Sequence, residues 1–333
     1  MSEAPRVSYI AGAAREPTAL ERAFYWLLAQ PGIGPLLRLL IRSGLLGRPA
    51  VIALPYLWLL LFFLAPFLIV LKLSFVESVL AQPPYTPLFE WIDGHLSLRL
   101  NLENYRMLLE DDLYWRSYLS SLRIAATSTL LALCIGLPMA YGMARAPASW
   151  RAPLVMMVVL PFWTSFLIRV YAWIGILKNE GLLNGLLLGL GIINEPLVIL
   201  NTEIAVYIGI VYSYLPFMIL PLYANLEKMD WSLLEAASDL GSPPWKSFWT
   251  ITVPLAMPGI IAGCFLVFIP AVGEFVIPDL LGGSDTLMVD KTLWVEFFQN
   301  RDWPLSSAVA VVLLVGLVAP IVLLQRQRRR LEA

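Results

Sequence analysis

The chain has 333 residues, of which 59% are hydrophobic and 14% are charged, whereas a soluble domain has about 45–50% apolar and about 25% charged residues. Together with a mean hydropathy of +0.74, this composition excludes a soluble globular enzyme and also a disordered chain, which needs few apolar residues. The net charge of −1 and the single histidine give no sign of a nucleic-acid partner or of a multi-histidine zinc site.

Residues 1–48 are predicted to form a cytoplasmic segment before a membrane domain over 49–333. Within 15–45, apolar residues recur at helical spacing and predict an amphipathic helix. The residues of this stripe are Leu20, Phe24, Leu27 and Leu28. Such a helix would lie on the inner membrane face or pack beside the first span, and the sequence leaves both interpretations open.

Six apolar segments are long enough to cross a bilayer, whose hydrocarbon core needs about 20 helical residues. We predict spans at about 51–72, 119–144, 152–177, 204–225, 251–278 and 304–325. A further apolar run over 181–194 is too short to cross, so it is interpreted as a re-entrant or surface segment. The predicted fold class is therefore all-α, a polytopic membrane protein with six transmembrane helices.

Lysine and arginine gather on one side of these spans. With the N-terminus inside, the inner segments hold 14 of these residues and the outer segments hold 6. The positive-inside rule then places both termini in the cytoplasm. This topology gives a periplasmic loop over 76–117 and a cytoplasmic loop over 226–250.

The cytoplasmic loop contains a short helix with sharp boundaries. Ser232 and Glu235 have the spacing of a capping box. Gly241 stands where the helix would end, and Pro243 and Pro244 prevent its continuation. Four residues at helical spacing form one apolar face. They are Leu233, Ala236, Ala237 and Leu240.

This loop resembles the signature of ATP-binding-cassette (ABC) importer permeases, which reads Glu-Ala-Ala, three residues, Gly, nine residues, then Ile-x-Leu-Pro. The matching residues are Glu235, Ala236, Ala237, Gly241, Ile251, Val253 and Pro254, with valine in place of leucine. The alternative interpretation is an ordinary hairpin between helices with a glycine stop.

The resemblance implies the fold of a type I ABC importer permease and a non-catalytic role in a bacterial inner membrane. The short helix would dock in a cleft of a separate ATPase, with Glu235 facing basic groups and Ala236 and Ala237 permitting close approach. ATP and magnesium would bind to the ATPase, and this chain would bind no cofactor. The implied partners are an ATPase homodimer, a second permease, a periplasmic binding protein and membrane lipid.

Three further segments are similar to the membrane subunits of bacterial spermidine/putrescine importers, and most of all to the first permease of a putrescine system. These segments cover 161–173, 268–283 and 300–304. The resemblance implies that the solute is a polyamine, either putrescine or spermidine.

Glu274 is an acidic residue at the end of a predicted span, where a carboxylate costs roughly 2.5–3.5 kcal/mol and should face a bundle interior or a wet cavity. A polyamine site needs carboxylates for the ammonium ends and aromatic faces along the stem. The candidate path residues are Glu274, Asp279, Trp163, Tyr171, Trp173, Tyr212 and Tyr214. In the alternative interpretation, Glu274 forms an ion pair with Arg169 that holds two spans together or closes a gate.

Two other functions remain open from the sequence. An ABC importer permease for another solute would keep the loop signature but line its path differently. A secondary transporter that works without an ATPase would have no use for the signature. A membrane enzyme is disfavoured because no nucleophile–base pair or metal constellation is visible.

Overall fold

The computed structural model describes residues 26, 35, 48–92, 95–284 and 286–332. The chain divides into two compact units, Met1–Ile69 and Val70–Ala333, and each is described by itself. The predicted amphipathic helix over 15–45 lies outside the described residues apart from Trp26 and Pro35.

The first unit contains most of the first predicted span. Helix α3 (Arg48–Leu59) continues through a π-helical turn, η1 (Leu60–Leu64), into α4 (Ala65–Leu73). The resulting apolar stretch, Val51–Leu73, has a mean hydropathy of 2.4 and none of it is buried within the chain. At 1.5 Å per residue it is long enough to cross a bilayer.

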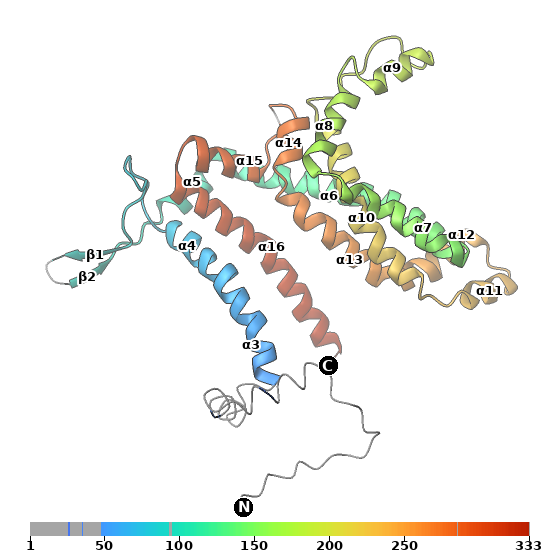
Figure 1. Ribbon diagram of the computed structural model, residues 1–333, viewed down its shortest axis with the longest axis horizontal. Helices are drawn as coiled ribbons and strands as arrows, with labels where there is room; N and C mark the ends of the chain where they lie inside the picture. The colour runs from blue at the N-terminus through green and yellow to red at the C-terminus, as the bar shows by residue number, and fades with distance from the viewer. Residues whose placement is uncertain (1–25, 27–34, 36–47, 93–94, 285, 333) are drawn as a thin grey trace, which may run out of the picture. The chain divides into compact units, whose positions relative to one another are not determined.

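The centre of the second unit is a set of three long helices that pack side by side (Figure 1). They are α6 (Asp112–Arg145), α10 (Glu203–Leu226) and α13 (Val253–Val272). Glycines permit this close approach, because a Cβ at Gly136 or Gly263 would lie within 2.8 Å of Met218 on α10. Small residues at such contacts are typical of helices packed inside a membrane.

The third predicted span, over 152–177, is bent by 90° rather than formed by one helix. It consists of α7 (Ala148–Val159), the 3₁₀ turn η2 (Leu160–Trp163) and α8 (Phe166–Leu177). Thr164 and Ser165 have extended backbone between these parts, and Pro161 has no N–H to continue the helix ladder. The apolar run after it forms only the short helix α9 (Leu182–Gly189).

The fifth span begins earlier and ends earlier than predicted. Helix α12 (Pro244–Ser247) and the π-helical turn η3 (Phe248–Thr252) lead directly into α13, which ends at Val272. The chain then turns into α14 (Val276–Leu281). Glu274 therefore lies in a turn after the span and not inside it.

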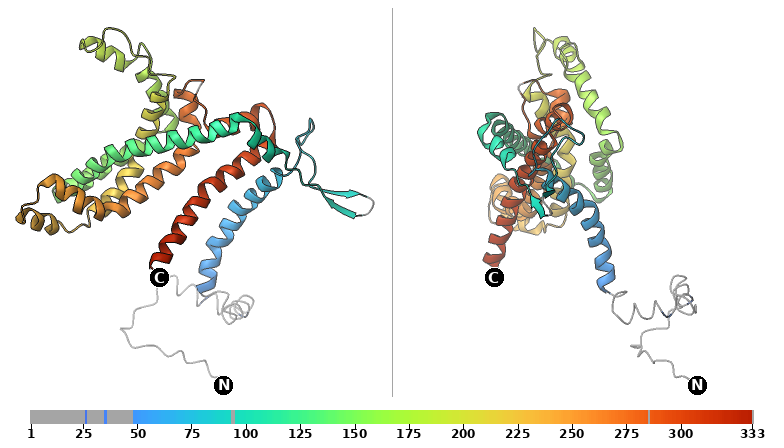
Figure 2. Two further views of the ribbon diagram at one scale, coloured as in Figure 1. Left: turned by 180° about the vertical axis from the view of Figure 1, so that it is seen from behind. Right: turned by 90° about the vertical axis from the view of Figure 1, so that its left-hand side faces the viewer.

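Helix α15, the turn η4 and the start of α16 lie at the end of the bundle opposite α11, which covers Ser232–Asp239 (Figure 1). Helix α15 (Val289–Trp294) continues into the π-helical turn η4 (Val295–Gln299), and α16 (Trp303–Glu332) follows. Figure 2 shows α6 from behind, with α15 at one end of it and α11 beyond the other.

The loop predicted over 76–117 contains regular structure. Strands β1 (Phe89–Ile92) and β2 (His95–Leu98) form an antiparallel hairpin, and helix α5 (Glu103–Glu110) follows. The side-chain amide of Asn104 donates to the carbonyl oxygens of Ser74 and Val76, at 3.1 and 2.9 Å, which fastens α5 to the chain after α4.

Four helices among the described residues are long and apolar enough to cross a membrane, and the bent pair makes five if it counts as one span. The apolar part of α16, Trp303–Ala319, is shorter. The prediction of an all-α, multi-pass membrane protein is confirmed.

Candidate functional site

Glu274 is almost completely buried, with 6% of the residue exposed. Its Oε1 accepts the backbone N–H groups of Val276 and Ile277, at 3.0 and 3.2 Å, in the first turn of α14. Its Oε2 accepts the hydroxyl group of Tyr214 on α10. A buried carboxylate is costly unless it is hydrogen-bonded. These three donors, two of them at a helix start, offset that cost.

A row of aromatic rings connects Glu274 to Arg169. The Tyr214 ring lies 6.2 Å from the Phe217 ring, which meets Phe162 edge-on at 5.1 Å. The Arg169 guanidinium lies 5.3 Å from the Phe162 ring centroid. A carboxylate and a cation thus stand at opposite ends of three rings. Because ring faces attract cations, this row has the chemistry to hold an alkyl chain with ammonium ends.

Arg169 does not pair with Glu274 in this conformation. Its guanidinium lies over the rings of Phe162 and Phe166, at 5.3 and 5.8 Å. Its Nε and Nη1 atoms are buried and have no hydrogen-bond partner among the described residues. The ion pair of the alternative interpretation is absent because two backbone N–H groups and a tyrosine already satisfy the carboxylate.

The other aromatic candidates divide into two groups. Trp173 and Tyr212 meet edge-on at 5.3 Å, between α8 and α10. Trp163 and Tyr171 are 77% and 58% exposed, so they are not packed in the row of rings between Glu274 and Arg169. Sequence reasoning also missed Phe162 and Phe217, because nothing in the sequence shows that η2 and α10 bring these two rings together.

Two more carboxylates lie near the Glu274 turn. Asp279 on α14 forms an ion pair with Lys291 on α15, at 3.6 Å. Its carboxylate is therefore engaged with a lysine. Asp290 lies against the turn, since a Cβ at Gly273 would be 3.5 Å from its Oδ2. Burial, and then the charge of Glu274, raises the pKa of Asp290 to about 6. Sequence reasoning missed Asp290 because it is one acid among many in this part of the chain.

Helix α15 is fastened to α6 by polar side chains that repeat about once per helical turn. The bonds join Tyr114 to Glu296 (2.9 Å), Ser117 to Thr292 (3.0 Å) and the Val289 N–H to Ser121 (2.8 Å). Because such buried polar groups are satisfied only in this register, they fix the position of Asp290 against the Glu274 turn.

At the opposite end of the bundle, α11 forms where the loop signature predicted a helix. The predicted capping box is wrong. The residue before the first turn is Trp231, and the N–H of Ser232 donates to Asp230 Oδ1 at 3.0 Å. Bonds from the Ser232 side chain and backbone lower the pKa of Asp230. The carboxylate two residues earlier therefore takes the role that the sequence assigned to Ser232.

Gly241 ends α11 as predicted. Its φ of +81° is a left-handed conformation that favours glycine. The N–H of Gly241 donates to Ser238 O at 2.8 Å, and the N–H of Ser242 donates to Ala237 O at 2.9 Å. This pair of bonds is a Schellman motif, which holds the chain in a fixed turn toward α12.

Helix α11 has no buried residue and presents two different faces. On its apolar face, Leu240 is 88% exposed. The opposite face lines a pocket of about 330 Å³, where Glu235 and Ser238 stand with Arg145, the last residue of α6, and Arg151 of α7. Glu235 thus lies on the side of this chain's own arginines, whereas the resemblance implied that it faces basic groups of an ATPase.

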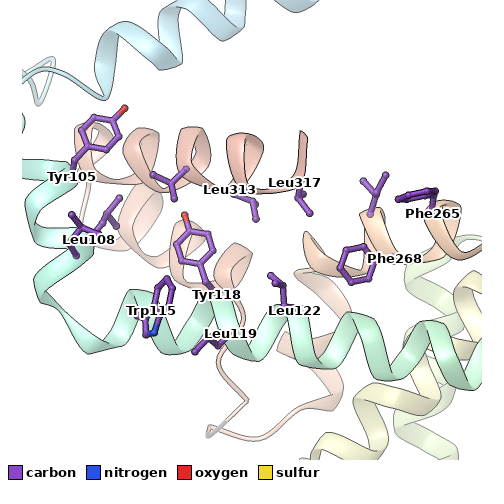
Figure 3. Close-up of a pocket in the computed structure, with 14 residues that line it drawn as sticks. Tyr105, Leu108, Trp115, Tyr118, Leu119, Leu122, Phe265, Phe268, Leu313 and Leu317 are labelled. Carbon is purple, nitrogen blue, oxygen red and sulfur yellow. The ribbon is translucent and has the colours of Figure 1, made fainter. Parts of the chain in front are cut away.

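A larger hollow lies between α5, α6, α13 and α16, with a volume of about 520 Å³. Figure 3 shows Tyr105, Trp115, Tyr118 and Phe268 around it. Among the described residues, no charged side chain lines it, and the Tyr118 hydroxyl is already bonded to Val309 O. Without a carboxylate to bind an ammonium group, the hollow is not assigned to the candidate path.

The family of proteins described as binding-protein-dependent transport system inner membrane component matches residues 49–332 of this chain. Three similar relatives are spermidine/putrescine transport system permease proteins PotB. The protein of Haemophilus influenzae is 43% identical and aligns over 79% of this chain and 88% of its own length. That of Escherichia coli K12 is 41% identical over 78% and 89%. That of Salmonella typhimurium is 39% identical over 83% and 91%.

Two similar solved structures show the same fold at 16% sequence identity. One is a bacterial ABC transporter involved in the import of the acidic polysaccharide alginate, with a TM-score of 0.65 over 89% of this chain and 99% of that one. The other is the bacterial alginate ABC transporter in complex with an alginate pentasaccharide-bound periplasmic protein, with a TM-score of 0.66 over 89% and 98%.

Proposed function

The chain belongs to the family of binding-protein-dependent transport system inner membrane components, and on this premise we propose that it is the permease subunit of an ABC importer that moves polyamines into the cytoplasm. The observation that carries the substrate class is the similarity to the PotB proteins, which extends over more than three quarters of this chain. Putrescine and spermidine are both within this class.

The arrangement around Glu274 supports a cationic solute. A polyamine has at least two ammonium groups joined by apolar stems. Glu274 can bind one ammonium group, and the rings of Tyr214, Phe217 and Phe162 can lie along the stem. With 6% exposure, Glu274 is closed to solute in this conformation. Transport therefore requires a second state that opens the turn.

Arg169 has a gating role in this proposal. Its guanidinium occupies the face of Phe162 that an ammonium group would contact. The solute and Arg169 then compete for the same ring, so the arginine leaves when a polyamine enters. Trp173 and Tyr212 form a second aromatic pair near the path.

The driving force comes from other subunits. The exposed apolar face of α11 docks with an ATPase homodimer, which binds ATP and magnesium and supplies the catalysis. A second permease completes the path, and a periplasmic binding protein delivers the solute. In this arrangement, α11 and both termini lie in the cytoplasm, and the chain itself is not an enzyme.

The proposal is tested by uptake in cells that lack other polyamine importers and express the complete transporter. Unlabelled putrescine, spermidine and spermine compete with labelled putrescine, and ornithine is the singly charged control. We expect at least one polyamine to compete and ornithine not to compete. No uptake of labelled putrescine or of labelled spermidine, with an ATPase still co-purifying, would indicate an importer for another solute. Uptake without any ATPase would indicate a secondary transporter.

A further inference from the structure

We infer that the pocket between α11, the end of α6 and the start of α7 binds the phosphate group of an acidic phospholipid. The pocket has a volume of about 330 Å³, large enough for a phosphate group with part of a headgroup. Arg145 and Arg151 line one side, and Trp231, Glu235 and Ser238 of α11 line the other. The inference rests on the proposed function, which places this end of the bundle at the cytoplasmic face.

Arg145 is held in place and still has hydrogen-bond donors to offer. One N–H, on Nη1, is directed to the hydroxyl of Tyr141 at 3.1 Å. The guanidinium carbon lies 5.6 Å from the ring centroids of both Tyr141 and Trp231. A guanidinium has five N–H groups. The two rings therefore orient a planar fork whose remaining N–H groups can bind an anion.

Arg151 is oriented in a different way. Its Nε donates to the carbonyl oxygen of Ala146 at 3.0 Å, which holds the side chain against the loop. Its Nη1 lies 3.8 Å from Glu227, whose same oxygen accepts the Tyr223 hydroxyl at 2.8 Å. At 3.8 Å the ion pair with Glu227 is longer than a hydrogen bond, so the terminal N–H groups of Arg151 remain available to an anion.

The free donors of the pocket favour an anion. Two guanidinium groups and one carboxylate, that of Glu235, line it, and Glu235 forms no ion pair with either arginine within the described residues. Glu227, the partner of Arg151, lies outside this lining. The guanidinium fork matches phosphate oxygens in geometry, so a phosphate between Arg145 and Arg151 would bind their remaining N–H groups, with the Ser238 hydroxyl as a further donor.

The surroundings of the pocket indicate the source of the phosphate. Exposed tryptophans lie on neighbouring elements at this end of the bundle: Trp150 is 59%, Trp245 is 73% and Trp249 is 50% exposed. Tryptophan gathers at membrane interfaces, so the pocket lies at headgroup height. Basic pockets between spans on the cytoplasmic side bind acidic lipid headgroups. The lipid would then connect the α6–α7 loop to α11 in every transport cycle.

The test uses the complete transporter, purified in mild detergent with an equal mixture of phosphatidylglycerol and phosphatidylcholine. Native mass spectrometry measures which lipid stays bound. We expect the natural protein to retain phosphatidylglycerol preferentially, and Arg145→Gln with Arg151→Gln to reduce this retention about tenfold or more, since each lost bond involves charged groups. Lys246→Gln removes a positive charge from exposed α12, outside the pocket, and should leave retention unchanged.

Arg151→Lys serves as a second variant that keeps the positive charge and loses the guanidinium fork. Its retention of phosphatidylglycerol should lie between that of the natural protein and that of the double glutamine variant. Equal phosphatidylglycerol retention by the natural protein and the double glutamine variant would overturn the inference. Saturable binding of inorganic phosphate at Arg145 and Arg151, with no preference between the lipids, would assign the pocket to a soluble anion and overturn the lipid source.

Lipid retention is measured without any solute. A failure of putrescine uptake with intact retention therefore counts against the proposed function alone, and lost retention preference with intact uptake counts against the lipid site alone.

Discussion

The Glu274 turn and helix α11 lie at opposite ends of the bundle and differ in almost every physical respect. Glu274 is buried, and donors from two elements satisfy its carboxylate. Helix α11 buries no residue, and its ends are fixed by local bonds at Asp230 and Gly241. A group that handles a small ion works best where water is excluded. A surface that receives a protein partner must stay exposed.

The comparison also explains how each region responds to change. At the Glu274 turn, the charge and its hydrogen-bond donors carry the function. Substitutions that keep the shape of a side chain but remove its charge or its hydroxyl group should therefore reduce uptake. At α11, the direction in which the chain leaves the helix is part of the function, so a substitution that disfavours the φ of Gly241 should matter even though it removes no side-chain contact. Four predictions sharpen this contrast, from the largest expected effect to the smallest.

Glu274→Gln should have the largest effect. The amide oxygen can still accept the N–H groups of Val276 and Ile277, so the turn should persist, but the charge that would bind an ammonium group is lost. A hydrogen bond to a charged group contributes about 1.5–3 kcal/mol, or roughly 10- to 150-fold. We expect the half-saturating concentration for putrescine uptake to rise within that range.

The control is Glu110→Gln, at an exposed carboxylate paired with Arg106 at 2.7 Å. Uptake by this variant should be normal. If Glu274→Gln transports normally and assembles normally, Glu274 serves only as a structural cap for α14.

Gly241→Ala should have the next largest effect. There is open space around a Cβ at this position, so any loss comes from the φ of +81°. A left-handed conformation costs about 1–2 kcal/mol for alanine, which disfavours the native turn roughly 5- to 30-fold. Uptake driven by ATP should fall by a comparable factor, while insertion in the membrane stays normal.

Gly142→Ala is the matched control for this variant. Gly142 also has open space for a Cβ, but it lies inside α6 with ordinary helical backbone. Equal uptake by the two variants would show that the direction of the chain after α11 does not matter for coupling.

Tyr214→Phe should have a smaller effect than Glu274→Gln. It removes one donor to Glu274 and leaves the two backbone donors in place. We expect uptake to fall by roughly tenfold or less. Tyr171→Phe, at a ring that is 58% exposed, should change uptake little. A larger loss in Tyr171→Phe than in Tyr214→Phe would exclude the proposed row of rings as the path.

The pH dependence through Asp290 should be the smallest effect. The pKa of Asp290 is raised from 3.8 to about 6, so between about pH 4 and pH 6 the folded protein binds more protons than the unfolded chain. Its contribution to stability therefore falls as pH rises through this window and is fully lost above about pH 6. In Asp290→Asn, the midpoint temperature of unfolding should depend less on pH over this range. Thermal unfolding of the purified complex at several pH values measures this.

Local patterns predicted the region around α11 well. Gly241 stands before a serine and two prolines, and glycine alone adopts a left-handed turn at no steric cost. The helix and its end were therefore readable from adjacent residues. The capping box failed because the helix begins one residue earlier than the spacing implies. The carbonyl oxygen of Trp231 accepts the N–H groups of Leu234 and Glu235, at 3.0 and 3.4 Å, and Asp230 accepts the N–H of Ser232.

The Glu274 turn was only partly predictable. An acid at the end of an apolar run is visible in a hydropathy pattern, which is why Glu274 was found. Its donors come from α10 and α14, and Asp290 reaches it from α15. Tyr214 lies 60 residues away in the chain and Asp290 lies on a later helix, so the pattern of neighbours offered no signal for them, and the sequence left a pair with Arg169 open as the alternative. The two N–H donors of α14, by contrast, are adjacent to Glu274 in the chain.

The sequence by itself determined that this is a multi-pass, all-α membrane protein and which loop forms an exposed helix, because hydropathy and turn chemistry act between residues that are close in the chain. Only the tertiary structure decided that the third span bends by 90°, that Glu274 is held by Tyr214 and a helix start, and that Glu235 lies near Arg145 and Arg151. Those outcomes depend on which distant donors, rings and charges packing brings together, and no local pattern encodes that choice.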